Sequence, residues 1–353
     1  MWPSNRLQHL FGIEHPIVQA PMAGASTPAM AIAVANEGGL GSLGCAMMPP
    51  EELRTAAAEV AAATNRAINF NFFVHTEPDL AAYDPSTMQR ALAPFYEEYG
   101  LEAPPAPALG APGFSDATLD VLLALSPKVV SFHFGLPSAD SIEALKRAGA
   151  KLIGCATNVA EARALEDGGM DAIVAQGAEA GGHRGAFIGA PHENDMGTIA
   201  LVPMVADAVR VPVIAAGGIF DGRGVAAAFK LGADGAQIGT AFLRAPQSAV
   251  SPLHKQALAD HPDNATRLTR LFSGRPARSV RNRLMDELGA QEHATAPFPT
   301  QRGLVAPLAV AAARRGKADF MPLWSGQGGP RAQEASTAKI FAQIRDQALA
   351  LLR

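Results

Sequence analysis

Cysteine is scarce in this sequence, and long apolar runs are lacking. The two cysteines, Cys45 and Cys155, have neither a C-x-x-C spacing nor the spacing of metal ligands. They are too few for a disulfide framework, so buried thiols in a reducing compartment are expected. No charged region followed by an apolar one opens the chain, and no apolar run approaches the ~18 residues of a membrane span. We therefore expect a cytoplasmic protein without a membrane partner.

A surplus of positive charge is also missing. The chain has 29 lysines and arginines against 33 aspartates and glutamates, a net charge of -4, which argues against a nucleic-acid partner. The histidines show no H-x-x-x-H spacing and no clustering with carboxylates, so no metal site is expected. A hydrophobic content of 48% is typical of a globular protein with a large core. A small molecule is the expected partner.

What the sequence does contain is an alternation of short β-rich runs with alanine-rich helical stretches, which is the pattern of β/α units. Eight such units favour an α/β fold of the closed (β/α)8 TIM barrel type, which needs about 250 residues. The chain has 353 residues, so one smaller unit is left over. The predicted strands cover residues 16–22, 39–44, 67–73, 129–135, 151–157, 172–177, 211–218 and 235–240. The clearest helices are predicted at residues 51–64, 138–147, 159–167 and 222–231.

Two segments interrupt this alternation. Residues 76–115 contain many prolines, so we interpret them as a long loop over the barrel mouth. Residues 245–322 are predicted to be helical, with helices at 252–259, 265–272 and 303–315 and no strand. A final helix at residues 335–352 has one apolar face and is expected to cover the barrel. We thus predict a barrel over residues 1–244, a smaller helical substrate domain after strand eight over 245–322, and a return loop with a closing helix over 323–353.

Glycines at two consecutive strand ends predict an anion site. Gly217 and Gly218 end the seventh strand, and Gly239 and Thr240 close the eighth. Adjacent glycines let backbone N–H groups approach an anion closely, and the loops after strands seven and eight are a frequent phosphate site in barrels. One such glycine is equally well explained as a simple turn, whereas two at neighbouring strand ends favour a phosphate. Asp221 is better explained as a helix N-cap than as a ligand.

Alternation along the strands places several polar side chains inside the barrel. In the fourth strand His133 faces inward near the upper rim, while Phe132 and Phe134 are expected to face the helices. In the third strand Asn71 faces inward and can hydrogen-bond the edge of a flavin ring. Because catalytic groups gather at this rim in barrels, His133 is favoured as functional over a buried structural histidine.

The end of the sixth strand and the loop after it also contain residues that can contact a cofactor. Gln176 faces inward at the top of its strand, and its amide offers both a donor and an acceptor to a ring edge. Gly181 and Gly182 permit the close approach of a cofactor. His183 is equally well interpreted as a second active-site group or as a loop residue hydrogen-bonded to the backbone.

Taken together, these motifs resemble those of class I nitronate monooxygenases, formerly called 2-nitropropane dioxygenases. The resemblance covers nearly the whole chain, and the strand SFHFG at residues 131–135 is its most discriminating part. The motifs GGI, GTAFL and EAGGH are also shared with flavin-dependent enoyl-thioester reductases and NADH:quinone reductases. The motifs are QAPMAG (19–24), NFF (71–73), SFHFG (131–135), QGAEAGGHRG (176–185), AAGGI (215–219), QIGTAFL (237–243) and LWSGQ (323–327).

The resemblance implies an FMN-dependent oxidoreductase with His133 as the catalytic histidine. Family members oxidise alkyl nitronates with O2 to a carbonyl compound and nitrite through an anionic flavosemiquinone. The alternative is an NAD(P)H-dependent quinone or enoyl-thioester reductase on the same FMN barrel, and a third is a non-redox barrel whose phosphate site binds substrate. The implied FMN contacts are Met22, Ala23, Gly24, Asn71, Gln176, Gly181, Gly182, Gly217, Gly218, Gln237, Ile238, Gly239 and Thr240.

The substrate side departs from the pattern of related enzymes, which place tyrosines and a lysine in the second domain. All three tyrosines here precede the fourth strand. The candidate substrate contacts are therefore His183, Phe298 and Arg302. A carboxylate-bearing nitronate, if it is the substrate, can find its positive charge at Arg302 or Lys317.

Overall fold

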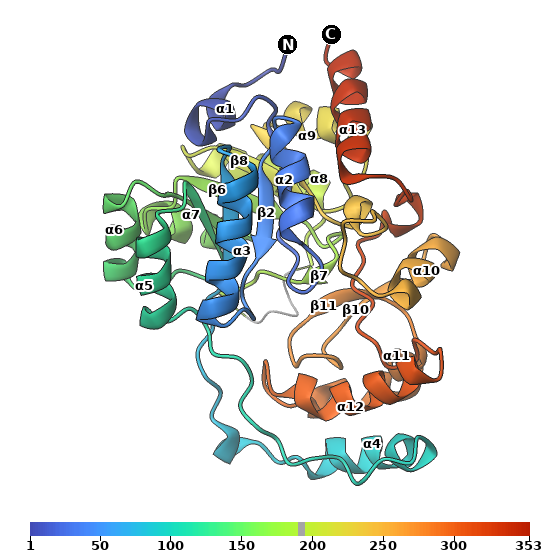
Figure 1. Cartoon of the computed structure of the whole chain (residues 1–353). Helices are drawn as coiled ribbons and strands as arrows, with labels where there is room; N and C mark the ends of the chain where they lie inside the picture. Colours follow the sequence, from blue (N-terminus) through green and yellow to red (C-terminus); the bar gives the residue numbers. More distant parts are fainter. Residues whose placement is uncertain (190–194) are drawn as a thin grey trace.

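The computed structural model describes residues 1–189 and 195–353 (Figure 1). Eight parallel strands form one sheet in the order β1-β9-β8-β6-β5-β4-β3-β2. A parallel bridge between Val18 and Leu40 joins the two ends of this order, so the predicted barrel is confirmed. The strands are β1 (Ile17–Gln19), β2 (Gly41–Gly44), β3 (Ile68–Phe73), β4 (Val129–His133), β5 (Lys151–Ala156), β6 (Ala172–Gln176), β8 (Val213–Ala216) and β9 (Gly235–Ile238).

Helices surround the barrel, and the four clearest predicted helices are all present. Side-chain caps start several of them, and Asp221 accepts from the backbone N–H groups of Arg223 and Gly224, which confirms it as an N-cap. The last helix packs against α9 and α2, as predicted. The helices are α1 (Arg6–Phe11), α2 (Pro28–Asn36), α3 (Pro50–Ala63), α5 (Asp116–Leu125), α6 (Ala139–Arg147), α7 (Val159–Asp167), α8 (Thr198–Ala208), α9 (Gly222–Lys230) and α13 (Thr337–Leu351).

The core has an outer and an inner part. Outward-facing Phe72 and Phe132 pack between the strands and the helices, where each buried phenylalanine contributes about 1.5–3 kcal/mol. Inside the barrel, apolar side chains such as Val129 and Ile214 pack with Leu7 of α1, which lies at the end of the barrel opposite the smaller part of the molecule (Figure 1). Nearer the other end the interior becomes polar, and Asn71 is buried there as predicted.

The smaller part of the molecule below the barrel in Figure 1, which we call the lower lobe, consists of the segment after β9 up to residue 322 together with a helix from residues 76–115, and it includes a small antiparallel sheet. Its strand order is β10-β11-β7, in which β7 (Gly182–His183) comes from the loop after β6. The prediction of a helix at 265–272 and of no strand in 245–322 is therefore wrong. Thr266 to Thr269 pair with Val280 to Ala277, and this distant partner overrides local helix preference. The elements are α10 (Pro252–Asp260), β10 (Thr266–Thr269), β11 (Ala277–Val280), α11 (Arg283–Leu288) and α12 (Gln301–Arg314).

The segment 76–115 is more ordered than predicted, because it contains helix α4 (Ser86–Glu98). This helix lies under α12 at the far edge of the lower lobe rather than over the barrel mouth (Figure 1). Met88, Leu92 and Phe95 recur at helical spacing and are buried in an apolar cluster with residues of α11 and α12. The Tyr96 hydroxyl donates to the Leu304 carbonyl at 2.8 Å, which fixes α4 to α12.

Four short 3-10 turns complete the described elements. They are η1 (Leu80–Ala82), η3 (Thr240–Phe242), η4 (Gly289–Ala294) and η5 (Gly329–Arg331). Within residues 1–189 and 195–353, no helix combines the length and the apolar character needed to cross a membrane.

Candidate active site

The predicted anion site lies where β8 and β9 end. Gly217 and Gly218 have φ values of +114° and +69°, a region that glycine adopts without strain. A Cβ on Gly218 would lie 3.3 Å from Cβ of Glu179, so the turn has little room for a side chain. Among the described residues, none accepts a hydrogen bond from the backbone N–H of Gly217, Gly218 or Thr240. We call this group of N–H donors the cradle.

The return loop 323–327 crosses beside the cradle and connects its parts. The N–H of Gly326 donates to Thr240 Oγ1 at 2.9 Å, and the N–H of Gln327 donates to the Glu179 carbonyl at 3.0 Å. Gly181 packs so closely here that a Cβ would lie 2.4 Å from the Gly326 nitrogen. The LWSGQ motif therefore holds the loops after β6 and β9 together.

The loop after β1 closes the same end of the barrel. Met22 Sδ lies 3.5 Å from the position that a Cβ on Gly239 would take, which brings the two loops into contact. The N–H of Met22 donates to Ser26 Oγ at 2.9 Å, and Gly24 has a φ of +75°. Met22, Ala23 and Gly24 thus lie next to the predicted cofactor residues of β9, Gln237 to Thr240.

Asn71 and Gln176 use their amides mainly to fix neighbouring groups. Asn71 Nδ2 donates to Ser131 Oγ on the adjacent strand at 2.9 Å. Gln176 Nε2 donates to the His183 carbonyl at 3.0 Å, and Gln176 Oε1 accepts from the Gly185 N–H at 2.8 Å. Gln176 therefore shapes the loop that carries His183.

The structure brings His133 and His183 together, although 50 residues separate them. His133 Nε2 lies 3.2 Å from the His183 carbonyl oxygen, and since a carbonyl can only accept, this bond assigns the proton to Nε2. His183 Nε2 lies 2.9 Å from Ser273 Oγ, which itself donates to the Arg275 carbonyl. The same reasoning assigns a proton to His183 Nε2. Each neutral imidazole then keeps a lone pair on Nδ1.

Burial keeps both imidazoles neutral. Loss of solvation is the largest cause that lowers the pKa of His133 from 6.5 to about 4, and the pKa of His183 to about 3. The positive charge of Arg275 lowers both further. At neutral pH the site therefore offers two uncharged hydrogen-bonding rings.

This depression predicts that acid destabilises the protein through these histidines. A histidine whose folded-state pKa lies below 6.5 binds its proton more readily in the unfolded chain, so stability falls as pH drops from 6.5 toward the folded-state pKa. We expect a loss of about 2 kcal/mol for His133 by about pH 5, because each pH unit is worth about 1.4 kcal/mol. Urea unfolding at several pH values measures it. His133→Gln should reduce the loss of stability between pH 7 and pH 5 by about 2 kcal/mol, whereas a matched change at exposed His9 should leave it intact.

Aromatic rings enclose His183. Its ring centroid lies 6.0 Å from Phe73, 5.8 Å from Phe134, 5.4 Å from Phe298 and 5.3 Å from Trp324. The predicted substrate residues His183 and Phe298 are therefore in contact. Phe73 and Trp324 were not predicted as site residues. The rings form a largely apolar wall around the polar imidazole edges.

The prediction that Phe134 faces the helices is wrong. Its φ is +76°, which turns the chain after β4 and directs the ring toward the mouth, 4.5 Å from the ring of His133. A left-handed conformation costs a non-glycine residue about 1–2 kcal/mol. Such strain is concentrated at functional sites, which is consistent with a site at this strand end.

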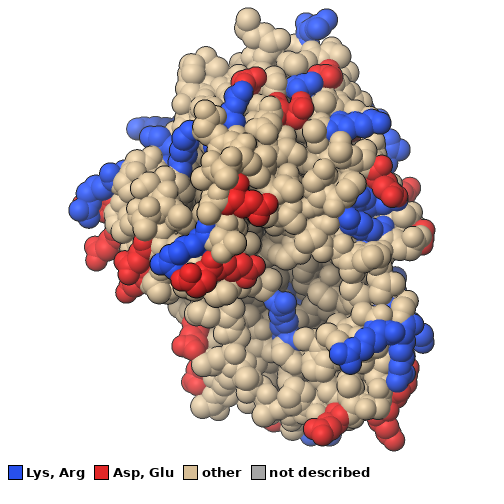
Figure 2. Space-filling model, in the orientation of Figure 1, with Lys and Arg blue, Asp and Glu red and all other residues tan. Residues whose placement is uncertain are grey.

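Arg302 lies at the edge of the site rather than inside it. It is exposed at the amino end of α12, and its guanidinium contacts the Met47 sulfur. Lys317 follows the carboxyl end of the same helix, about 20 Å further along at 1.5 Å per residue. Figure 2 shows a hollow between the barrel and the lower lobe, with a basic side chain at the hollow.

Arg275 is a site residue that sequence analysis missed. It lies in the turn before β11, and its Cζ is 4.0 Å from the centroid of the Phe134 ring. Pairing of β11 with β7 sets Ala277 opposite His183, which brings this turn to the mouth. The sequence signal that could have identified this residue is a pair of arginines in the stretch LFSGRPARSV (271–280), which has no other charged residue.

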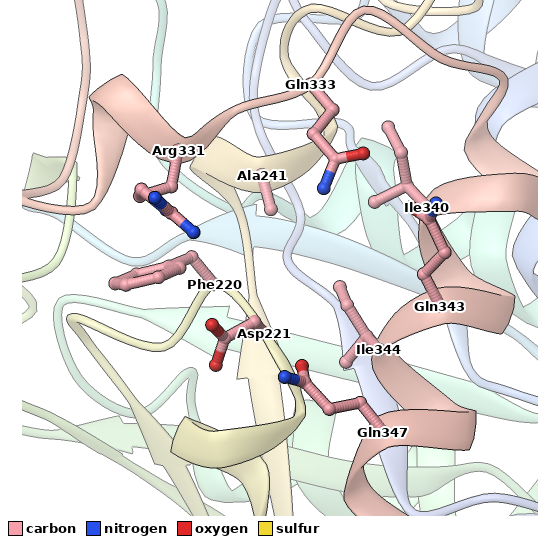
Figure 3. A pocket seen from close by; sticks show the side chains of 9 residues that line it. All are labelled: Phe220, Asp221, Ala241, Arg331, Gln333, Ile340, Gln343, Ile344 and Gln347. Atoms are coloured by element: carbon pink, nitrogen blue, oxygen red, sulfur yellow. The ribbon is translucent and has the colours of Figure 1, made fainter.

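A separate polar pocket lies on the outer side of the cradle, between the loop after β8 and α13 (Figure 3). Asp221, Arg331 and Gln347 reach into it, and neither His133 nor His183 lines it.

The part of the chain that the structure describes contains no group of three or more His, Cys, Asp or Glu placed to hold a metal ion. The histidine site is thus the candidate reaction centre.

Comparisons with known proteins identify the family to which the chain belongs. The nitronate monooxygenase family matches residues 4–345. The chain belongs to the nitronate monooxygenase family. A probable nitronate monooxygenase of Staphylococcus aureus strain JH9 is 40% identical over 348 residues, which cover 98% of each chain. Membership of this family makes the chain an oxidoreductase.

The chain is also similar to several solved structures. A nitroalkane oxidase from Streptomyces ansochromogenes superposes with a TM-score of 0.91 at 39% identity, over 98% of both chains. FabK from Thermotoga maritima has a TM-score of 0.75 at 29% identity, over 99% of this chain and 97% of that one. An enoyl reductase domain from Bacillus amyloliquefaciens shares only the fold, at 13% identity.

Proposed function

We propose that the chain is an FMN-dependent nitronate monooxygenase that oxidises alkyl nitronates with O2 to a carbonyl compound and nitrite. The observation that supports this proposal most is the pair of neutral imidazoles, His133 and His183, which lie together at the same end of the barrel as the cradle. Family membership supports the reaction class. The similarity to a nitroalkane oxidase supports a nitro compound as the substrate.

The residues present fit FMN. The free N–H groups of Gly217, Gly218 and Thr240 match a phosphate, and the turn between β8 and α9 is narrow enough to exclude a side chain. Bound there, FMN would accept electrons from the nitronate and pass them to O2. The proposed FMN residues are Met22, Ala23, Gly24, Asn71, Gln176, Gly181, Gly182, Gly217, Gly218, Gln237, Ile238, Gly239 and Thr240.

The low histidine pKa values favour a nitronate over a neutral nitroalkane as the substrate. An efficient general base has a pKa near the working pH, and values of about 4 and 3 are far below neutrality. A nitronate has already lost its proton, so it needs only orientation. We assign His133 as the catalytic residue that lies beside the reacting group, with His183 and Phe298 contacting the substrate and Arg302 at the rim.

Spectra and product analysis of the purified protein test this function. A yellow protein that releases FMN on denaturation, changes its flavin spectrum on anaerobic mixing with propyl nitronate, and releases nitrite in air is the expected result. Rapid bleaching by NADH without nitronate turnover would replace the proposal with the quinone or enoyl-thioester reductase. A colourless protein that apoprotein reconstitution cannot load with FMN would contradict both.

A further inference from the structure

The site contains a half-buried cation, Arg275, that forms no ion pair among the described residues. We propose that Arg275 binds the anionic O–N–O group of the nitronate, and thereby selects the charged substrate over the neutral nitroalkane. This inference rests on the proposed function and adds a specificity-determining residue to it.

The guanidinium of Arg275 is held in a defined place. It stacks on Phe134 with its Cζ 4.0 Å from the ring centroid, and its Nη2 donates to the Ala186 carbonyl. The Phe134 ring lies 4.5 Å from the ring of His133 and 5.8 Å from that of His183. The guanidinium and both imidazoles therefore pack around the same aromatic ring.

At least one N–H donor of the Arg275 guanidinium has no acceptor among the described residues. Its Nε is buried and has no hydrogen-bond partner, and it forms no ion pair with any carboxylate in the described part of the chain. Arg283 in the lower lobe differs, because it pairs with both Glu98 and Glu287. A half-buried cation without an ion-pair partner is unfavourable, and a bound anion reduces that penalty, because Glu161 acts on this charge only from beyond ion-pair distance.

The charge persists at neutral pH. Burial lowers the pKa of Arg275 to about 10, which still leaves the guanidinium protonated. The nearby histidines are neutral and the surrounding rings are apolar, so nothing in the wall competes for an anionic ligand. The low polarity of the wall strengthens the attraction between the cation and a bound anion.

A guanidinium matches a planar anion with two oxygens, because its N–H groups form a fixed fork. The nitronate group and a carboxylate share this shape, so both are possible ligands by chemistry. We assign the nitronate group because Arg275 packs on the same ring, Phe134, as the two histidines, near which we place the reacting carbon. A carboxylate at the far end of a longer substrate would instead reach the exposed rim at Arg302.

Steady-state kinetics with two nitronates test the assignment. For Arg275→Gln we expect KM to rise about 10- to 100-fold for both propyl nitronate and the carboxylate-bearing propionate 3-nitronate, as for a lost charged hydrogen bond. Arg315→Gln is the matched control, because Arg315 also stacks on a ring, Tyr99 at 4.5 Å, and donates to a backbone carbonyl. It should leave both KM values unchanged.

Nitrite binding gives a readout that does not depend on turnover. Nitrite has the same O–N–O shape, and calorimetric titration of the FMN-loaded protein should show its affinity falling about 10-fold or more in Arg275→Gln. Arg275→Lys keeps the charge but loses the fork, so it should raise the nitronate KM less than Arg275→Gln. If Arg275→Gln does not fold, an unchanged KM in Arg275→Lys would overturn the assignment.

Two other outcomes also overturn it. One is a loss confined to propionate 3-nitronate, which would assign Arg275 to the carboxylate. The other is FMN-loaded Arg275→Gln with wild-type KM values and nitrite affinity. If the proposed function itself is wrong, the wild-type protein will turn over neither nitronate. If only the assignment of Arg275 is wrong, wild-type turnover is normal.

Discussion

Replacing His133 with asparagine is expected to lower kcat/KM for propyl nitronate about 100-fold or more while FMN stays bound. Positioned hydrogen-bonding groups at a reaction centre are typically worth this much. FMN remains because His133 contacts the His183 carbonyl and the Phe134 ring rather than the cradle. The measurements are the flavin-to-protein ratio and steady-state oxygen consumption.

His254→Asn is the matched control for His133→Asn. His254 is buried and His133 half-buried, but the His254 Nε2 also lies near a backbone carbonyl, that of Trp324 at 3.1 Å, and loss of solvation also lowers its pKa to about 4. The control should lose stability without a comparable loss of turnover. If His133→Asn instead releases FMN, fails to fold or keeps wild-type turnover, His133 is a structural histidine.

Gly218→Ala should raise the dissociation constant of FMN about 10- to 100-fold, the cost of disturbing a charge-assisted hydrogen bond. A Cβ at a φ of +69° is strained, and it would lie 3.3 Å from Cβ of Glu179, so the turn must shift and misalign its N–H groups. Fluorescence titration of the apoprotein with FMN measures the effect.

Gly232→Ala separates backbone strain from loss of the cradle. Gly232 has a φ of +96°, and its Cβ would also lie 3.3 Å from a neighbouring Cβ, that of Ala206. It precedes β9, however, so it lies at the opposite end of the barrel from the cradle. Both variants should lose about 1–2 kcal/mol of stability, while only Gly218→Ala loses FMN affinity. Equal FMN affinity in the two would argue against a phosphate at Gly218.

The barrel could be predicted from the sequence because each strand is a short apolar run that ends in a distinctive residue. Inward His133 and Asn71 followed from strict alternation within β4 and β3, which the regular backbone obeys. The same rule failed at Phe134, since alternation holds only while the chain stays extended and a φ of +76° ends it. Phe134, the first residue after the end of β4, is thus the residue whose orientation was predicted wrongly.

The lower lobe was harder to predict because its structure depends on distant partners. β10 is four residues long and is a strand only through its pairing with β11. The proline-rich part of 76–115 obscured α4, although Met88, Leu92 and Phe95 have helical spacing. Arg275 had no local signal of function, because its position depends on the pairing of β11 with the loop after β6.

The lower lobe is assembled from two stretches of chain that lie far apart in the sequence, α4 before β4 and the segment after β9. Replacing a single segment of the chain therefore cannot transfer this lobe from one barrel to another. A fragment of residues 1–244 would carry α4 with Met88, Leu92 and Phe95 uncovered, a patch prone to aggregation. Grafting a new substrate lobe onto this barrel requires replacing both stretches together.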